Sequence, residues 1–128
     1  MQIGVRTSRT VLVVDDDADM RKLLKDFLEP GGYAVIEAAN GDDVMALVDS
    51  EAIDVVVLDK EMPGLNGLEV LSLLHQRCPW LPVIFVTAFG GPQVAEESRR
   101  RGALEYLEKP FRVRRIVDTI DDVVRRRH

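Results

Sequence analysis

The sequence predicts an α/β protein: a doubly wound, five-stranded parallel sheet that helices cover on both faces. Three observations support this prediction. Apolar segments of strand length alternate five times with segments of helical periodicity. Several strand segments are apolar at successive positions, which is typical of strands buried on both faces of a parallel sheet. The length of 128 residues is that of one ordinary domain and is too short for two.

The predicted strands are short apolar runs that end at polar or turn-forming residues. They comprise residues 10–14, 33–38, 54–59, 81–88 and 104–109. The first run continues as VLVV and the third as VVVL, with no polar position inside either. These two strands are therefore expected to be buried on both faces of the sheet.

The predicted helices are recognised by apolar residues that recur every three or four positions. These sets are Met20, Leu23, Leu24, Phe27 and Leu28; Val44, Leu47 and Val48; Leu68, Val70, Leu71 and Leu74; and Val113, Ile116, Val117, Ile120 and Val124. Asp17 and Asn66 stand just before two of these helices and are expected to cap their first turns. A further helix is expected to begin at Pro92 and to end before Gly102.

The composition excludes several classes of protein. An apolar fraction of 46% and a charged fraction of 30% fit a soluble globular domain. No apolar run approaches the roughly 18 residues that span a membrane, and no secretion signal opens the chain, so we expect a cytoplasmic protein without membrane contacts. A single cysteine, Cys78, excludes an internal disulfide. The net charge of -5 argues against general nucleic-acid binding.

Polar side chains gather where the predicted strands end. In sheets of this class, ligands bind beyond the carboxyl ends of the strands, at the point where strand order reverses. The residues at these ends are Asp15 and Asp16, Asp59, Thr87 and Lys109. Two carboxylates about 4 Å apart repel by about 4 kcal/mol at an effective dielectric constant near 20, so a cation such as Mg²⁺ is expected between them. Aspartate attacks phosphoryl groups, whose oxygens a hydroxyl and a lysine can contact.

Four segments extend this pattern over nearly the whole chain. They are VLVVDDDADMRKLL, DVVVLDKEMPGLNGLEVL, PVIFVTA and GALEYLEKPF. In this order and spacing, the sequence resembles bacterial response-regulator receiver domains of the CheY-like superfamily. The resemblance implies one receiver domain over residues 1–128 without an effector domain, and a flavodoxin-like (βα)5 fold with strand order 2-1-3-4-5. It also implies a role in two-component or phosphorelay signalling, with catalysis limited to the domain's own phosphorylation and dephosphorylation.

The resemblance assigns roles to the acidic residues. Asp59 is the phosphoacceptor, which takes a phosphoryl group from a sensor histidine kinase or a phosphotransfer protein. Asp16, Asp59 and the backbone carbonyl of Glu61 are ligands of Mg²⁺, with Mn²⁺ as an expected substitute, and Asp15 acts through water. Glu61 and Phe89 occupy positions that tune the access of water to the phosphoryl group. We expect both side chains to slow its hydrolysis.

The resemblance also assigns the switch. Thr87 is the hydroxyl that moves toward the phosphoryl group, and Lys109 contacts the phosphoryl oxygens. Lys109 precedes Pro110 across a peptide bond that is often cis in the family. Tyr106 matches the aromatic residue that turns inward when the hydroxyl moves, although a tyrosine in a short strand can also be simple packing.

The arginines of the last third indicate a surface for partners. They are Arg99, Arg100, Arg101, Arg112, Arg114, Arg115, Arg125, Arg126 and Arg127. In receivers, the fourth helix, fifth strand and fifth helix form the usual signalling surface, so this basic surface is expected to bind an effector domain or protein, and phosphorylation could produce a homodimer. A solvated helix surface is the alternative. Direct nucleic-acid binding is not expected, because no base-reading motif follows the last helix.

Two other functions remain as alternatives. A Mg²⁺-dependent phosphatase of the haloacid dehalogenase type also uses a strand-end aspartate, but that nucleophile normally follows the first strand, whereas Asp59 follows the third. A receiver fold used only for binding would usually lack an acidic, hydroxyl or lysine position, and this chain has all of them. The chain ends where the last helix is expected to end, so it is either a stand-alone receiver or part of a larger regulator.

Overall fold

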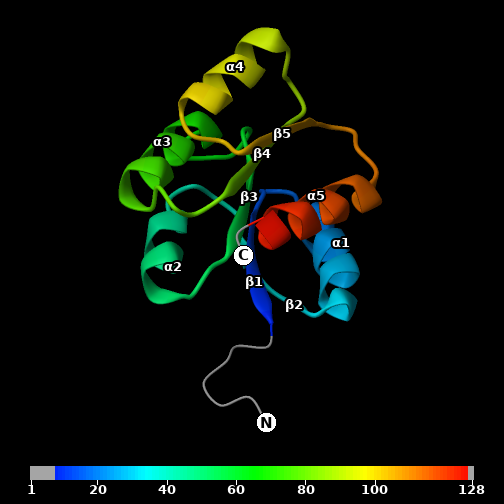
Figure 1. Ribbon diagram of the computed structural model, residues 1–128. Helices are drawn as coiled ribbons and strands as arrows, with labels where there is room; N and C mark the ends of the chain where they lie inside the picture. Colours follow the sequence, from blue (N-terminus) through cyan, green and yellow to red (C-terminus); the bar gives the residue numbers. More distant parts are fainter. Residues whose placement is uncertain (1–7, 127–128) are drawn as a thin grey trace.

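A five-stranded parallel sheet lies at the centre of the computed structural model, which describes residues 8–126 (Figure 1). The strand order is β2-β1-β3-β4-β5, which confirms the predicted fold class. The elements are β1 (Arg9–Val14), α1 (Ala18–Leu28), a 3-10 turn η1 (Glu29–Gly31), β2 (Tyr33–Ala38), α2 (Val44–Ser50), β3 (Val55–Asp59), α3 (Gly67–Arg77), β4 (Val83–Thr87), α4 (Pro92–Arg100), β5 (Glu105–Glu108) and α5 (Val113–Arg126).

The sheet divides the hydrophobic core into two layers, and helices cover the layer on each face (Figure 1). Side chains alternate between the faces along each strand, so Val11 and Val13 pack toward α1 and α5. Leu12 and Val14, from the same strand, pack toward α2 and α3. All four are fully buried, so this part of β1 is apolar on both faces of the sheet. The continuous apolar runs in the sequence follow from this burial on both sides.

Helices α1 and α3 begin directly after the predicted N-capping residues, Asp17 and Asn66. The Asp17 side chain accepts hydrogen bonds from the backbone N–H groups of Asp19 and Met20, and the Asn66 side chain accepts one from Glu69. These contacts satisfy N–H groups that have no partner within a helix, so both predicted caps are confirmed.

The predicted limits of α4 are also correct. This helix begins at Pro92, and Gly102 follows it with a φ of 113°, in the left-handed region that favours glycine. The predicted strands 81–88 and 104–109 extend one or two residues beyond β4 and β5. None of the helices within residues 8–126 is both long enough and apolar enough to cross a membrane.

Candidate functional site

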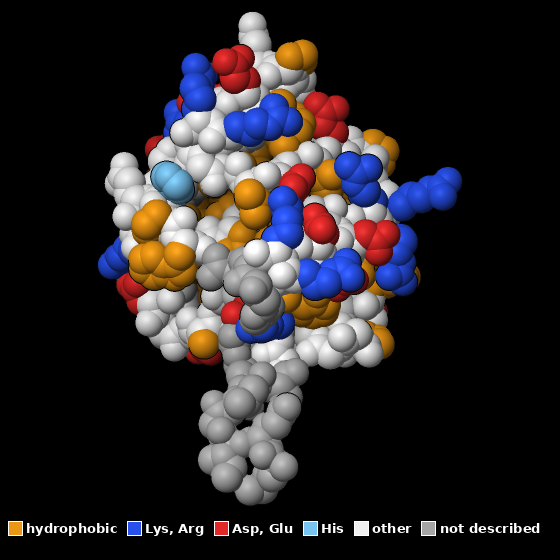
Figure 2. Space-filling view, in the orientation of Figure 1, with side chains coloured by type: hydrophobic (Ala, Val, Ile, Leu, Met, Phe, Trp, Pro, Cys, Tyr) orange, Lys and Arg blue, Asp and Glu red, His pale blue; other side chains and the backbone are white. Residues whose placement is uncertain are grey.

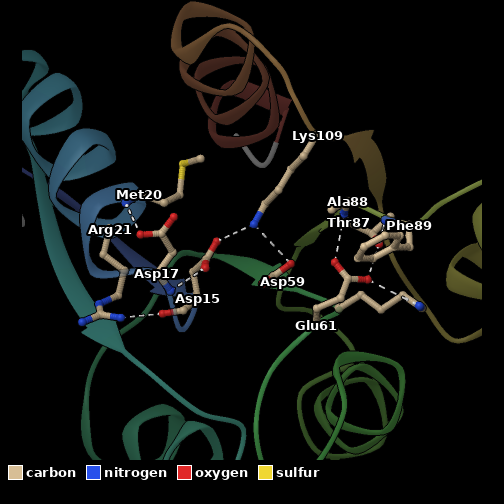
Figure 3. Close-up of polar contacts among 11 residues, drawn as sticks. Asp15, Asp17, Met20, Arg21, Asp59, Glu61, Thr87, Ala88, Phe89 and Lys109 are labelled. Atoms are coloured by element: carbon tan, nitrogen blue, oxygen red, sulfur yellow. Dashed lines mark hydrogen bonds and ion pairs between the residues drawn. The ribbon is translucent and has the colours of Figure 1, made fainter.

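Two buried carboxylates and a lysine meet at the carboxyl end of the sheet (Figure 3). The Nζ atom of Lys109 lies 2.9 Å from Oδ2 of Asp15 and 3.4 Å from Oδ1 of Asp59. Asp15 is 3% exposed and Asp59 is 2% exposed, so both carboxylates are removed from water. The structure thus brings together three of the polar residues found at the ends of the predicted strands.

The register of the sheet explains why the two carboxylates are neighbours. β1 and β3 are adjacent, and Val14 pairs with Leu58, so the next residues, Asp15 and Asp59, lie side by side. The chain leaves β1 toward β2 and leaves β3 toward β4, which makes this edge the point where strand order reverses. Lys109, just past the end of β5, completes the site, and the peptide bond that follows it is cis.

Gly67 holds the β3–α3 loop against the end of β3. A Cβ atom at this position would lie 2.5 Å from the carbonyl oxygen of Asp59 and 2.5 Å from Cα of Lys60. The Gly67 N–H also donates a 2.9 Å hydrogen bond to the carbonyl of Lys60. Only glycine allows this approach of two backbone segments. Sequence reasoning missed the role of Gly67, whose only signal is a glycine in the first turn of a helix.

The acidic cluster has the chemistry of a site for a hard cation. Carboxylate oxygens of Asp15, Asp16 and Asp59 all lie within 4.8 Å of one another. Oδ1 of Asp59 is buried and accepts no hydrogen bond among residues 8–126. Its contact with Lys109 is an ion pair at 3.4 Å. Asp16 is exposed, so the cluster opens toward solvent on one side. A buried oxygen without a hydrogen-bond donor and a set of oxygen ligands both fit Mg²⁺.

The electrostatics of the site act most strongly on Asp59. Burial, followed by the charge of Asp15, raises the pKa of the Asp59 carboxyl to about 7, although Lys109 opposes this shift. Burial lowers the pKa of Lys109, but the contacts with Asp15 and Asp59 outweigh it and hold that pKa above its ordinary value. The lysine therefore stays charged, while Asp59 changes protonation near neutral pH without a metal.

This pKa leads to a pH-dependent stability of the metal-free domain. The pKa of Asp59 rises from 3.8 to about 7 on folding, so the protonated carboxyl favours the folded state. Its contribution is fully present below about pH 4 and is lost as the pH rises through about 7. In EDTA, the melting temperature of the wild type should therefore fall more steeply between about pH 5 and about pH 8 than that of Asp59→Asn. Equal slopes would contradict the prediction.

Thr87 contacts Glu61 in this structure (Figure 3). The buried Thr87 hydroxyl donates to Oε2 of Glu61 at 2.5 Å, and the Ala88 N–H donates to Oε1 of the same carboxylate at 2.9 Å. No hydrogen bond joins Thr87 to Asp59 in the part of the chain that the structure describes. Sequence reasoning placed Glu61 near the site through its backbone carbonyl and missed this role of its side chain.

The Glu61 carboxyl has a lowered pKa as a result of these contacts. Burial acts to raise its pKa, but hydrogen bonds from Thr87, Ala88 and Lys60 outweigh burial and hold the pKa below its ordinary value. Lys60 also lies 3.4 Å from Oε2 as an ion pair. Phe89 is 72% exposed. Its predicted effect on hydrolysis stays a prediction.

Tyr106 is connected to the β4–α4 loop. Its hydroxyl donates to Oε2 of Glu108 at 2.8 Å and accepts from the Gly91 N–H at 3.2 Å. A Cβ atom at Gly90 would overlap this hydroxyl, so the loop fits closely against it. The ring is partly buried and packs against the core layer of α2 and α3. The packing explanation and the switch role are both compatible with this position, and the switch role stays a prediction.

Acidic partners accompany several arginines of the predicted signalling surface. The ion pairs are Arg100 and Arg101 with Glu97, Arg114 with Asp118, and Arg126 with Glu105 and Asp122. Arg101 also donates to the carbonyl of Leu68 and to the Ser72 hydroxyl, so it joins α4 to α3. Figure 2 shows basic and acidic side chains intermixed over α5. Arg127 lies outside the described residues.

A hollow of about 740 Å³ opens beside these arginines. It lies between the end of β5 and the beginning of α5, and its charged lining consists of Arg112, Arg114, Arg115, Glu108 and Asp118. The surface thus offers a concave region of mixed charge with an excess of arginine.

Comparisons with known proteins agree with this geometry. The family model for the response regulator receiver domain matches residues 11–121. The response regulator protein FleR of Pseudomonas aeruginosa is 37% identical over 110 residues, which are 86% of this chain and 23% of FleR. The sporulation initiation phosphotransferase F of Bacillus subtilis is 36% identical over 110 residues, which are 86% of this chain and 89% of that protein.

The chain spans about a quarter of some of these relatives, including FleR and the DNA-binding transcriptional regulator NtrC of Salmonella typhimurium, of which it covers 25%. Solved structures are similar as well. The receiver domain of the Francisella response regulator 1452 has a TM-score of 0.89 at 28% identity, over 94% of this chain and 99% of that one. The BeF3-activated DrrB receiver domain has a TM-score of 0.84 at 27% identity, over 92% and 98%.

Proposed function

The chain belongs to the response regulator receiver family, and on that premise we propose that Asp59 is its phosphoacceptor. It is a receiver domain of two-component signalling and not a conventional enzyme, which removes the phosphatase alternative. One observation carries the assignment to Asp59. Its Oδ1 atom is buried, accepts no hydrogen bond in the described region, and lies in the acidic cluster beside the Lys109 ammonium.

The side chains of the site support transfer of a phosphoryl group to Asp59. An oxygen of ionised Asp59 attacks phosphorus, an O–P bond forms, and the N–P bond to the histidine of the donor kinase breaks. Lys109 is already within 3.4 Å of Asp59 and can contact the added oxygens through charge-assisted hydrogen bonds. Thr87 is expected to turn from Glu61 toward the phosphoryl group, and this movement shifts a two-state equilibrium in the β4–α4 loop.

The metal site has a proposed set of ligands. Asp16 and Asp59 would hold Mg²⁺ with their carboxylates, the backbone carbonyl of Glu61 would add a third oxygen, and Asp15 would act through water. When bound, the metal supplies positive charge to the carboxylates and to the phosphoryl oxygens. Mn²⁺ prefers similar oxygen ligands and is expected to substitute.

The partners of this chain follow from the family and from the surface. A two-component receiver implies a histidine kinase as partner. We propose that a phosphotransfer protein can also act as the donor and that the output partner binds at the arginine-bearing surface of α4, β5 and α5. We also propose that phosphorylation can produce a homodimer. We also propose a cytoplasmic location, which is typical of the family.

The phosphoacceptor is tested by intact mass. After incubation with Mg²⁺ and a small phosphodonor, the wild type should gain one phosphoryl group and Asp59→Asn should gain none, because an amide is not a comparable nucleophile. Asp17→Asn is the matched control, since Asp17 is an acid of the same corner that only caps α1, and it should gain the group. A gain of one phosphoryl group by Asp59→Asn would show that another residue is the phosphoacceptor. No gain by the wild type would favour the binding-module alternative.

A further inference from the structure

The carboxylate of Glu61 binds two hydrogen-bond donors at the end of β4. The Thr87 hydroxyl is 2.5 Å from Oε2, and the Ala88 N–H is 2.9 Å from Oε1, so each carboxylate oxygen accepts from a different group. Lys60 approaches Oε2 at 3.4 Å and places a positive charge beside it. Hydrogen bonds to an ionised acceptor are stronger than neutral ones. Glu61 therefore fixes the direction of the Thr87 hydroxyl.

In the proposed function, the same Thr87 hydroxyl turns toward the phosphoryl group on Asp59. A hydroxyl has a single proton and cannot donate to Glu61 and to a phosphoryl oxygen on Asp59 at once. We propose that Glu61 is a positioning residue whose carboxylate competes with the phosphoryl group for the Thr87 hydroxyl and so opposes activation of the unphosphorylated domain. This inference rests on the proposed phosphoacceptor role of Asp59. It adds that the Glu61 carboxylate competes with the phosphoryl group within the same molecule.

The contacts of the following loop extend the effect of this competition. The Phe89 N–H donates to Oγ1 of Thr87 at 3.0 Å, so a rotation of the Thr87 side chain also breaks a loop contact. The Gly91 N–H, two residues later, donates to Oε2 of Glu108 at 2.8 Å and to the Tyr106 hydroxyl at 3.2 Å. Release of Thr87 from Glu61 thus removes a contact at one end of a loop whose other end is bound to the predicted switch tyrosine, although the Ala88 N–H can stay bound to Glu61.

A double-mutant cycle separates competition from a simple effect of charge. Glu61 is also an anion near Asp59, and its removal favours an anionic ligand whether or not Thr87 is involved. The ligand is beryllofluoride, a phosphoryl analogue, titrated with excess Mg²⁺ in a calorimeter. Glu61→Ala should tighten binding about tenfold, equivalent to about 1.4 kcal/mol, when Thr87 is present. In a Thr87→Val background, the same change should tighten binding by less than about threefold.

Three results of the cycle would overturn the competition. Equal gains in both backgrounds would show that Glu61 acts through its charge alone, and weaker binding by Glu61→Ala would show that it assists activation. Absence of beryllofluoride binding by the wild type would refute the phosphoacceptor proposal and the competition with it.

Amide signals of the metal-free domain report the contact without phosphorylation. Loss of a carboxylate acceptor weakens the Ala88 hydrogen bond, so Glu61→Ala should move the Ala88 amide proton upfield, and Glu61→Gln should restore part of the shift through its amide oxygen. Glu108→Ala is the matched control. It removes an acceptor of the Gly91 N–H. It should therefore shift the Gly91 amide signal and leave the Ala88 amide signal unchanged. An unchanged Ala88 signal in Glu61→Ala would overturn the inference.

Discussion

Replacing Lys109 with methionine is expected to destabilise the metal-free domain by about 2–3 kcal/mol at about pH 8. The methionine keeps most of the apolar stem but removes the charge, which leaves the buried carboxylates of Asp15 and Asp59 facing each other without the ammonium. Asp59, whose pKa is already about 7, can take up a proton and limit this loss. At about pH 5, Asp59 is largely protonated in both proteins, so the loss should be smaller. Urea unfolding in EDTA measures both values.

Lys22→Met is the matched control for this prediction. Lys22 also pairs with a carboxylate, Asp26 at 2.8 Å, but its side chain is 73% exposed. An exposed pair of this kind contributes little to stability, and neither pH nor Mg²⁺ should change that contribution much. Mg²⁺ should restore part of the lost stability in Lys109→Met, because it supplies the missing positive charge to the same carboxylates. Equal losses for the two variants at both pH values would contradict a central role for Lys109.

The layers of the fold are predictable because they depend on local periodicity. A strand buried on both faces must be apolar at every position, as at Val11 to Val14, and a helix over a sheet must be apolar at every third or fourth. Capping is equally local, and the predictions for Asp17 and Asn66 are confirmed. The strand order is different in kind. It depends on pairing between distant segments, and the resemblance to receiver domains, rather than periodicity, predicts that β1 lies between β2 and β3.

The same distinction applies to the site. Strand ends meet at one edge of a parallel sheet, so the sequence alone predicts that Asp15, Asp59 and Lys109 converge, and the two ion pairs confirm it. The direction of a side chain on a loop depends on the path of the loop and on its rotamer, and neither leaves a pattern in the sequence. This is why the hydrogen bond from Thr87 to Glu61 was not predicted. The hydroxyl has the expected position and a different partner.

The arginine-bearing surface shows how charge counting can mislead. The arginines cluster in sequence as predicted, but four of them have acidic partners in the structure, and Arg101 joins two helices through Leu68 and Ser72. Most of these partners are three or four residues away on the same helix, a spacing that the sequence contains. The free positive charge of the surface is therefore smaller than the number of arginines indicates.

Replacing Asp16 with alanine is expected to abolish Mg²⁺-dependent phosphorylation of Asp59 and to leave the fold as stable as the wild type or slightly more so. Asp16 is exposed, and its side chain makes no hydrogen bond or ion pair within residues 8–126, so its loss breaks no polar contact there. It does remove one of three carboxylates within 4.8 Å of one another, which relieves repulsion. The variant loses a proposed ligand of the metal, so Mg²⁺ should no longer raise its melting temperature.

Thermal melts with and without Mg²⁺ separate this prediction from a general defect. At a Mg²⁺ concentration 100-fold above the dissociation constant, the wild type should gain about 2.7 kcal/mol of stability, and Asp16→Ala should gain almost none. Asp17→Ala should behave in the opposite way. It loses the cap of α1 and about 1 kcal/mol of stability, but it should keep the stabilisation by Mg²⁺ and the phosphorylation. A Mg²⁺-dependent shift in Asp16→Ala equal to that of the wild type would show that the metal is held without Asp16. These opposite results for Asp16→Ala and Asp17→Ala require that the two adjacent aspartates have different roles. Asp16 binds the metal, and Asp17 caps the first turn of α1.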